Sequence, residues 1–218
     1  IVFAIAAATY LLTIEPTASF WDCGEFISTA DKLEVGHPPG APFFMLTAKF
    51  FTLFASDQTQ VAMMVNSFSA ICSALCILFL FWTITHLTRK LVLDGEVSEQ
   101  TEIPLNKIIT ILGAGAVGAL AYTFSDTFWF SAVEGEVYAY SSLFTAVVFW
   151  AILKWEDVAD QPYANRWLIL IAYLMGLSIG VHLLNLLTIP VLALVYYYKK
   201  FTPTTKGTIY TLLASCGI

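Results

Sequence analysis

The feature that most constrains this sequence is a series of long apolar segments with very few charges. A helix needs about 20 apolar residues to cross a hydrocarbon core of roughly 30 Å, because each residue rises 1.5 Å. Segments of this kind predict membrane spans at residues 1–14, 61–88, 107–124, 136–154, 166–181 and 184–198, with the start of another from residue 208. Only 12% of the 218 residues are charged, against about 25% in soluble domains. We therefore predict an all-α, polytopic transmembrane helical bundle.

A more polar segment, residues 15–60, separates the first two predicted spans and is expected to form a loop outside the membrane. Its apolar stretch FFMLTAKFFTLFA, residues 43–55, is too short to cross comfortably, so we predict a helix that lies along the membrane surface. The sequence begins and ends within apolar runs. We expect it to be the N-terminal part of a longer transmembrane domain, with the remaining spans and any C-terminal domain missing.

The basic residues are distributed unequally between the two sides of the predicted bundle. One side carries eight of the ten Lys and Arg residues, namely Arg89, Lys90, Lys107, Lys154, Arg166, Lys199, Lys200 and Lys206. The positive-inside rule assigns this side to the cytoplasm, so the loop 15–60 should face a periplasm or a lumen. We therefore expect an integral multi-pass protein of a bacterial inner membrane, or of the endoplasmic reticulum in a eukaryote.

The loop 15–60 contains two acids, Asp22 and Glu25, at the start of a predicted amphipathic helix. Their spacing is typical of a capping box, in which the two side chains satisfy main-chain N–H groups of the first turn. The same spacing also suits chemistry, because an ionised carboxylate held at a helix N-terminus can act as a general base toward a hydroxyl. A third interpretation is that the two carboxylates share a divalent metal ion.

The motif HPPG, residues 37–40, follows the acidic helix. In a structural interpretation, Pro38 forces His37 into an extended conformation, and Pro39 or Pro42 begins the next helix. In a functional interpretation, the rigid turn directs the imidazole of His37 back toward the acids, where it would bind a phosphate or orient a carboxylate. The N-terminus of the helix after the prolines would itself favour a phosphate.

Two later segments on the same side contain further candidates. Glu134 and Glu136 lie at the edges of predicted spans, where acids more often face a cavity than lipid. Glu136 also fits a simple N-terminal helix charge. His182 and Asn185 are three residues apart in a turn between two short spans. They would either project together into one cavity or form a buried hydrogen-bonded pair that closes the turn.

Other classes of site and partner are not indicated. The net charge of −6 argues against nucleic acid, whose phosphates require clustered Lys and Arg. The sequence has no Walker loop, no GxGxxG after a strand and no HExxH motif. Its four cysteines form no CxxC pair, so we expect packing thiols, with Cys23 as the one exposed candidate.

Three motifs, SFWDCGEFISTADKLEVGHPPGAPFF, AVEGEVYAYSSLF and GLSIGVHLLNLLTIP, together resemble a family of multispanning membrane proteins. The family is common in bacteria and includes the animal transmembrane protein 260. It is similar to the GT-C glycosyltransferases, among them the protein O-mannosyltransferases and the lipid A aminoarabinose transferases. The resemblance implies a GT-C-like fold with two membrane-parallel helices in the first outward loop. It also implies transfer of a sugar from a polyprenyl- or dolichyl-phosphate to a hydroxyl, such as that of a protein Ser or Thr, on the non-cytoplasmic face.

The resemblance also implies roles for individual residues. Asp22 matches the acidic residue that acts as the catalytic base near the start of the loop, and Glu25 is the alternative. Contacts to the donor or the acceptor would come from His37, Pro38, Glu134, Glu136, His182 and Asn185. No cofactor is certain, and a divalent metal remains open. The expected partners are a lipid-linked sugar, a protein or glycan acceptor and the bilayer. Because the outward side has few cations, the phosphate clamp would lie in the missing part, which predicts that the fragment alone is inactive.

The alternative class is a transporter, or a lipid-binding or scaffold protein, without catalysis. Such a protein would use the same acids and histidines for a substrate path. An inverted internal repeat would favour this interpretation, but the D-x-G-E loop has no counterpart later in the sequence.

Overall fold

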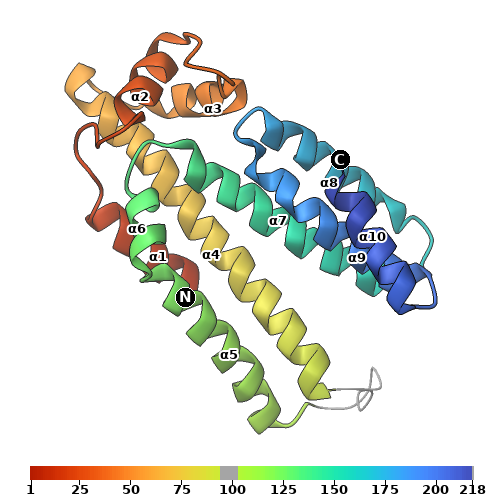
Figure 1. Cartoon of the computed structure of the whole chain (residues 1–218). Coiled ribbons are helices and arrows are strands. Elements are labelled where there is room, and N and C mark those ends of the chain that lie inside the picture. Colours follow the sequence, from red (N-terminus) through yellow and green to blue (C-terminus); the bar gives the residue numbers. More distant parts are fainter. Residues whose placement is uncertain (94–102, 218) are drawn as a thin grey trace.

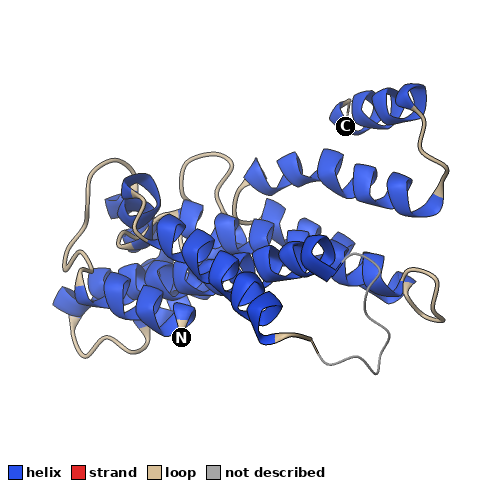
Figure 2. Ribbon diagram, turned by 90° about the horizontal axis from the view of Figure 1, so that it is seen from below, coloured by secondary structure: helices blue, strands red, loops and turns tan. Residues whose placement is uncertain are grey.

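The computed structural model describes residues 1–93 and 103–217, which form helices joined by turns and loops, without strands (Figures 1 and 2). The α-helices are α1 (Val2–Leu12), α2 (Cys23–Lys32), α3 (Pro42–Thr52), α4 (Val61–Leu93), α5 (Leu105–Thr123), α6 (Asp126–Ala132), α7 (Val137–Val158), α8 (Asn165–Ile179), α9 (Ile189–Lys200) and α10 (Thr205–Cys216). Two 3₁₀ helices, η1 (Gln58–Gln60) and η2 (Leu183–Thr188), precede α4 and α9. The predicted all-α class is confirmed for the described residues.

Three helical segments are long and apolar enough to cross a membrane: Gln58–Leu93, Leu105–Thr123 and Val137–Val158. They confirm long apolar helices at the predicted spans 61–88, 107–124 and 136–154. α8 and α9 are shorter, with 15 and 12 residues. The chain turns at Gly180, and the six-residue 3₁₀ helix η2 separates α8 from α9.

α4 is the central helix of the bundle (Figure 1). It contacts α1 and α5 on one side and α7 on the other, and α8, α9 and α10 continue the bundle beyond α7. α2 and α3 lie across the N-terminal end of α4 (Figure 1). A cluster of buried apolar side chains fixes them there, with Phe44 of α3 fully buried and its ring 5.8 Å from that of Phe68 in α4.

The helix predicted over residues 43–55 is present as α3, and it begins at Pro42. Proline suits this first position, because its missing N–H would have no partner within the helix and its φ already matches the helix. The loop before α2 is fastened to α4 by Asn66. The buried amide nitrogen of Asn66 donates to the main-chain oxygens of Glu15 and Thr17, at 2.6 and 3.0 Å.

The helix ends that carry the eight basic residues lie at the end of the bundle away from α2 and α3 (Figure 1). Ion pairs connect neighbouring helix ends there. Lys90 Nζ of α4 lies 2.7 Å from Glu156 Oε2 of α7, and Lys200 Nζ of α9 lies 2.9 Å from Asp160 Oδ1 just after α7. The molecule therefore has one basic end and one acidic end, as the predicted loops imply.

Candidate functional site

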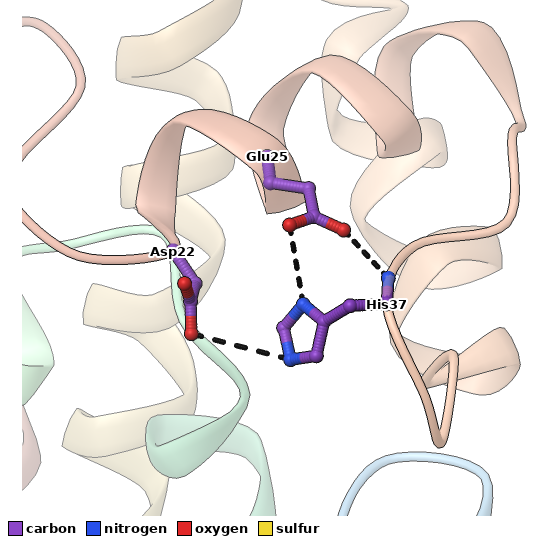
Figure 3. Close-up of side chains that lie close together, drawn as sticks. All are labelled: Asp22, Glu25 and His37. Atoms are coloured by element: carbon purple, nitrogen blue, oxygen red, sulfur yellow. Dashed lines mark hydrogen bonds and ion pairs between the residues drawn. The ribbon is translucent and has the colours of Figure 1, made fainter.

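The acidic end contains a triad of Asp22, Glu25 and His37 (Figure 3). Glu25 lies in the first turn of α2, and the chain after α2 turns back so that His37 faces it. Glu25 Oε1 accepts a hydrogen bond from the main-chain N–H of His37 at 2.6 Å, and Oε2 lies 3.2 Å from His37 Nδ1. The predicted orientation of the imidazole toward the acids is therefore confirmed.

The predicted capping box is wrong. Asp22 occupies the N-cap position, but its side chain caps no main-chain N–H, and Glu25 bonds to His37 instead. The physical reason lies in the backbone of Asp22, which is already helical at φ −86° and ψ 0°. A capping side chain normally comes from an extended N-cap residue, whose conformation directs it over the first turn. The Asp22 carboxylate is instead 59% exposed, with Oδ2 4.0 Å from His37 Nε2.

The two carboxylates consequently differ in chemistry. The main-chain N–H of His37, and then its ring, stabilise the ionised form of Glu25 and lower the pKa of that carboxyl. Both Glu25 oxygens are occupied, so Glu25 is a weak proton acceptor that holds His37 in place. Asp22 has a carboxylate that remains accessible beside the ring (Figure 3).

A pocket of about 80 Å³ opens beside the triad. Its walls come from three separate segments of the chain: Asp22, Phe26, His37, Pro39, Gly40 and Ala41 from the first loop, Glu136, Val137 and Tyr138 at the start of α7, and Val181 and His182 after α8. Four predicted site residues, Asp22, His37, Glu136 and His182, thus line one pocket. Pro39 also lines it, whereas the predicted Pro38 does not.

Glu134 and Glu136 lie behind α2 and are only 5% and 6% exposed. The thiol of Cys23 lies between them, with Sγ 3.6 Å from Glu134 Oε2 and 3.7 Å from Glu136 Oε1. The prediction that Cys23 is exposed is wrong: it is fully buried, because it starts α2 on the face that packs against the two acids. Only Glu136 of this pair reaches the pocket.

Burial raises the pKa of Glu136 to about 6, and the neighbouring charge of Glu134 adds to the effect. Burial also raises the pKa of Glu134, and hydrogen bonds from Ser19 and Cys23 partly offset this increase. Burial of a thiol next to two acids raises the pKa of Cys23, so this residue remains protonated and donates. The back of the pocket can therefore take up a proton on Glu136 at about pH 6.

His182 and Asn185 do not project into the same cavity. His182 lines the pocket with its ring 5.5 Å from that of Tyr138, and burial lowers the pKa of the imidazole. Asn185 is fully buried, and its Nδ2 donates to Ser178 Oγ at 2.9 Å. The two diverge because His182 is an extended N-cap residue, outside the helical repeat that contains Asn185. The predicted bonded pair is also absent, because His182 Nδ1 accepts from the N–H of Leu184.

The N-terminus of α3 is not available to a phosphate, contrary to the expectation. The N–H groups of Phe43 and Phe44 both point at the main-chain oxygen of Gly180, at 2.7 and 3.4 Å. Pro42 has no N–H, and the next donor, Met45, bonds to Ala41. The carbonyl of Gly180 therefore satisfies the helix end and brings His182 against the first loop.

A much larger apolar groove, of about 720 Å³, begins one helical turn along α7 from the pocket and two residues along the chain after His182. It runs between α4, α5, α7 and the segment 184–191. On α7, Tyr138 of the pocket is followed on the same helical face by Ser142, Thr145 and Phe149 of the groove. Leu184 continues it from His182 on the other side. The sequence shows this groove only as small polar residues within an apolar helix, which are a weak signal.

The triad also has the donor set of a cation site. One ligand atom from each of Asp22, Glu25 and His37 lies within 4.8 Å of the other two. Because Glu25 already binds His37 through both oxygens, the ligand atoms that remain open are those of Asp22 and Nε2 of His37. A hydrogen-bonded carboxylate on Nδ1 is the usual support for a histidine that binds metal through Nε2.

Residues 22–205 match the protein family described as "Protein O-mannosyl-transferase TMEM260 N-terminal domain". Protein O-mannosyl-transferase TMEM260 of Mus musculus is 28% identical over 182 residues, which are 82% of this chain and 22% of that protein. Protein O-mannosyl-transferase tmem260 of Dictyostelium discoideum is 25% identical over 149 residues, which are 68% of this chain and 16% of that protein. The chain thus spans about a fifth of the length of these relatives. No solved structure matches it.

Proposed function

Because the chain belongs to the protein O-mannosyl-transferase TMEM260 N-terminal domain family, we propose that it forms the catalytic loop and the first helices of a membrane O-mannosyltransferase. The enzyme would move a mannosyl group from a polyprenyl- or dolichyl-phosphate to the hydroxyl of a protein Ser or Thr. We assign it to the GT-C type, with α2 and α3 lying along the membrane surface. The named relatives support the transferase class, and the pocket supports the location of the reaction.

The observation that carries this proposal is the placement of the polar pocket and the apolar groove one helical turn apart along α7. A lipid-linked sugar has a long apolar chain, a phosphate and a sugar in sequence. The groove of about 720 Å³ fits the chain, and the pocket one turn away along α7 contains two carboxylates and two histidines for the polar end. The pocket of about 80 Å³ is small for a sugar and an acceptor together. Further parts of the longer protein would complete it.

In this mechanism Asp22 is the general base. It takes the proton of the acceptor hydroxyl as that oxygen attacks the anomeric carbon, and the bond from that carbon to the phosphate oxygen breaks. The lipid phosphate leaves with the bonding electrons. Glu25 positions His37, whose ring would contact the phosphate and offset its charge. A divalent ion held by Asp22 and His37 Nε2 would supply the same positive charge.

The reaction would take place on the non-cytoplasmic face. The segments that line the pocket, from α2, the start of α7 and the turn after α8, lie at the end of the bundle opposite the basic helix ends (Figure 1). Basic loops mark the cytoplasmic side of membrane proteins. The lipid phosphate would therefore lie in the outer or luminal leaflet, with its chain in the groove.

The test is mannosyl transfer by the full-length protein in proteoliposomes, with radiolabelled polyprenyl- and dolichyl-phosphate mannose as donors. We expect Asp22→Asn to lower kcat by about 100-fold or more, the usual contribution of a general base. Glu25→Gln should cause a smaller loss, since it only loosens His37. The matched control is Glu34→Gln, which removes an exposed carboxylate of the same loop that lines neither the pocket nor the triad.

Three results would change the proposal. Full activity of folded Asp22→Asn would remove Asp22 as the base. A larger loss in Glu25→Gln than in Asp22→Asn would exchange their roles. No transfer by the wild type with either donor would contradict the transferase assignment.

Chelation tests the source of the positive charge. We expect transfer to survive an excess of EDTA, because only two protein ligands, Asp22 and His37 Nε2, remain open at the triad. Loss of transfer with EDTA and its recovery with Mn²⁺ or Mg²⁺ would instead assign Asp22 and His37 to a metal ion.

A further inference from the structure

A second polar pocket, of about 330 Å³, lies at the basic end of the bundle. It lies near the C-terminal ends of α4 and α7, whereas the triad lies near their N-terminal ends (Figure 1). Trp82, Thr85, His86 and Arg89 of α4 line it together with Trp150 and Lys154 of α7. The α4 residues recur at helical spacing on one face, as do the two α7 residues. The transfer reaction proposed above uses none of them.

The apolar part of this pocket is a rigid pair of indoles. The rings of Trp82 and Trp150 lie 5.8 Å apart, and the ring of Phe79 packs edge-on against both, at 5.1 and 5.3 Å. Trp82 is nevertheless 39% exposed. Both tryptophans belong to helices long and apolar enough to cross a membrane, and tryptophan is enriched at the level of the lipid headgroups.

Among the described residues, the charged part of the pocket has more basic groups than the neighbouring acids neutralise. Lys90 binds Glu156 at 2.7 Å and Asp157 at 3.6 Å on the edge of the pocket. Lys154 Nζ is 4.0 Å from Asp157 Oδ2 and 5.9 Å from the centre of the Trp150 ring. Arg89 is exposed and forms no ion pair with the described residues.

We propose that this pocket binds the phosphate of an anionic phospholipid from the leaflet at the basic end of the bundle. The guanidinium of Arg89 and the ammonium of Lys154 are the groups that bind phosphate oxygens. The indoles of Trp82 and Trp150 contact the glycerol and the first carbons of the acyl chains. A free phosphate would use only the two charges, whereas a lipid uses the whole lining, which is why the lipid is the better fit.

Native mass spectrometry of the full-length protein with phosphatidylglycerol and phosphatidylcholine of identical acyl chains tests this site. We expect preferential binding of phosphatidylglycerol, and about fivefold weaker binding for each charge removed by Arg89→Gln or Lys154→Gln. The control Lys206→Gln removes an exposed basic residue at the same end that does not line the pocket. Arg89→Lys should retain most of the binding, because it keeps the charge.

Each other outcome overturns the proposal. Equal binding of the two lipids would mean that the pocket does not distinguish an anionic from a zwitterionic headgroup. An equal loss in Lys206→Gln would indicate diffuse attraction to the basic end. Displacement of phosphatidylglycerol by equimolar inorganic phosphate would mean that the pocket binds a free anion. These experiments do not involve sugar transfer, so they remain informative whatever the result of the transfer assay.

Discussion

At the scale of single residues, contacts rather than residue types decide which acid can act as a base. Asp22 and Glu25 are three residues apart at the start of α2, and either would qualify from the sequence. Glu25 is engaged by the main chain and the ring of His37, which lowers the pKa of its carboxyl. Asp22 remains exposed beside the same ring. This difference is why we assign the base to Asp22 and the positioning role to Glu25.

The buried acid Glu136 makes a prediction about pH at the same scale. Its pKa in the folded protein is about 6, above the value of 4.5 that an unperturbed glutamate has. Its contribution to the free energy of unfolding is therefore fully present below pH 4.5 and is lost as the pH rises through 6. The loss amounts to on the order of 2 kcal/mol. We expect Glu136→Gln to raise the thermal unfolding midpoint relative to wild type at pH 7.5 but not at pH 4.5.

Thermal unfolding of the full-length protein in detergent at the two pH values measures this effect. Some pH dependence should remain in the variant, because Glu134 also has a raised pKa. Glu34→Gln, at an exposed site, should behave like the wild type at both values. An identical pH dependence in wild type and Glu136→Gln would mean that Glu136 is not the titrating group.

At the scale of elements, the pocket depends on the contact between α3 and the end of α8. The oxygen of Gly180 accepts from Phe43 and Phe44 at the N-terminus of α3. A Cβ atom at position 180 would lie 3.0 Å from Cβ of Phe43 and 3.5 Å from its main-chain N. This contact is tighter than ordinary van der Waals packing, so Phe43 would have to move by a few tenths of an ångström to accept a Cβ atom at position 180.

We therefore expect Gly180→Ala to lower the free energy of unfolding by about 1–3 kcal/mol, the usual cost of overpacking. The pocket should loosen as well, because residues 39–41 and 181–182 both line it. Gly176→Ala is the matched control within α8, since its Cβ would meet nothing within 4 Å. It should stabilise the helix by up to about 1 kcal/mol. Chemical denaturation measures the free energy of unfolding of both variants. Equal values for the two would show that α3 and α8 are not closely packed.

At the scale of the whole molecule, the two ends of the bundle have different polar groups. The triad and the buried acids lie at one end, and the eight basic residues lie at the other. In a membrane this asymmetry predicts one orientation, with the triad on the non-cytoplasmic face.

Cysteine labelling in intact cells tests this orientation. In a full-length background without other accessible cysteines, and with the exposed Cys216 replaced by serine, we expect an impermeant maleimide to label Glu34→Cys directly. Lys206→Cys should react only after permeabilisation. The opposite pattern would place the triad in the cytoplasm and contradict the proposed reaction face.

The sequence by itself determined the elements that depend on local chemistry. Runs of apolar residues predicted the helices α4, α5 and α7, since only a helix satisfies its own backbone in hydrocarbon. Pro42 marked the start of α3, and the positions of the basic residues indicated the two ends. The orientation of His37 toward the acids was one of two interpretations of the HPPG motif, and the contacts with Glu25 in the structure decide for it.

The tertiary structure alone decided which distant residues share a site. Glu136 and His182 reach the pocket because α7 and the turn after α8 pack against the first loop. Asn185 misses it because an extended residue starts η2, and Cys23 is buried because α2 turns that face toward Glu134 and Glu136. The apolar groove lies between four segments, and the small polar residues of α7 are only a weak local signal for it. Local patterns report the conformation of a segment, but the meeting of segments depends on packing energies that are summed over the whole molecule.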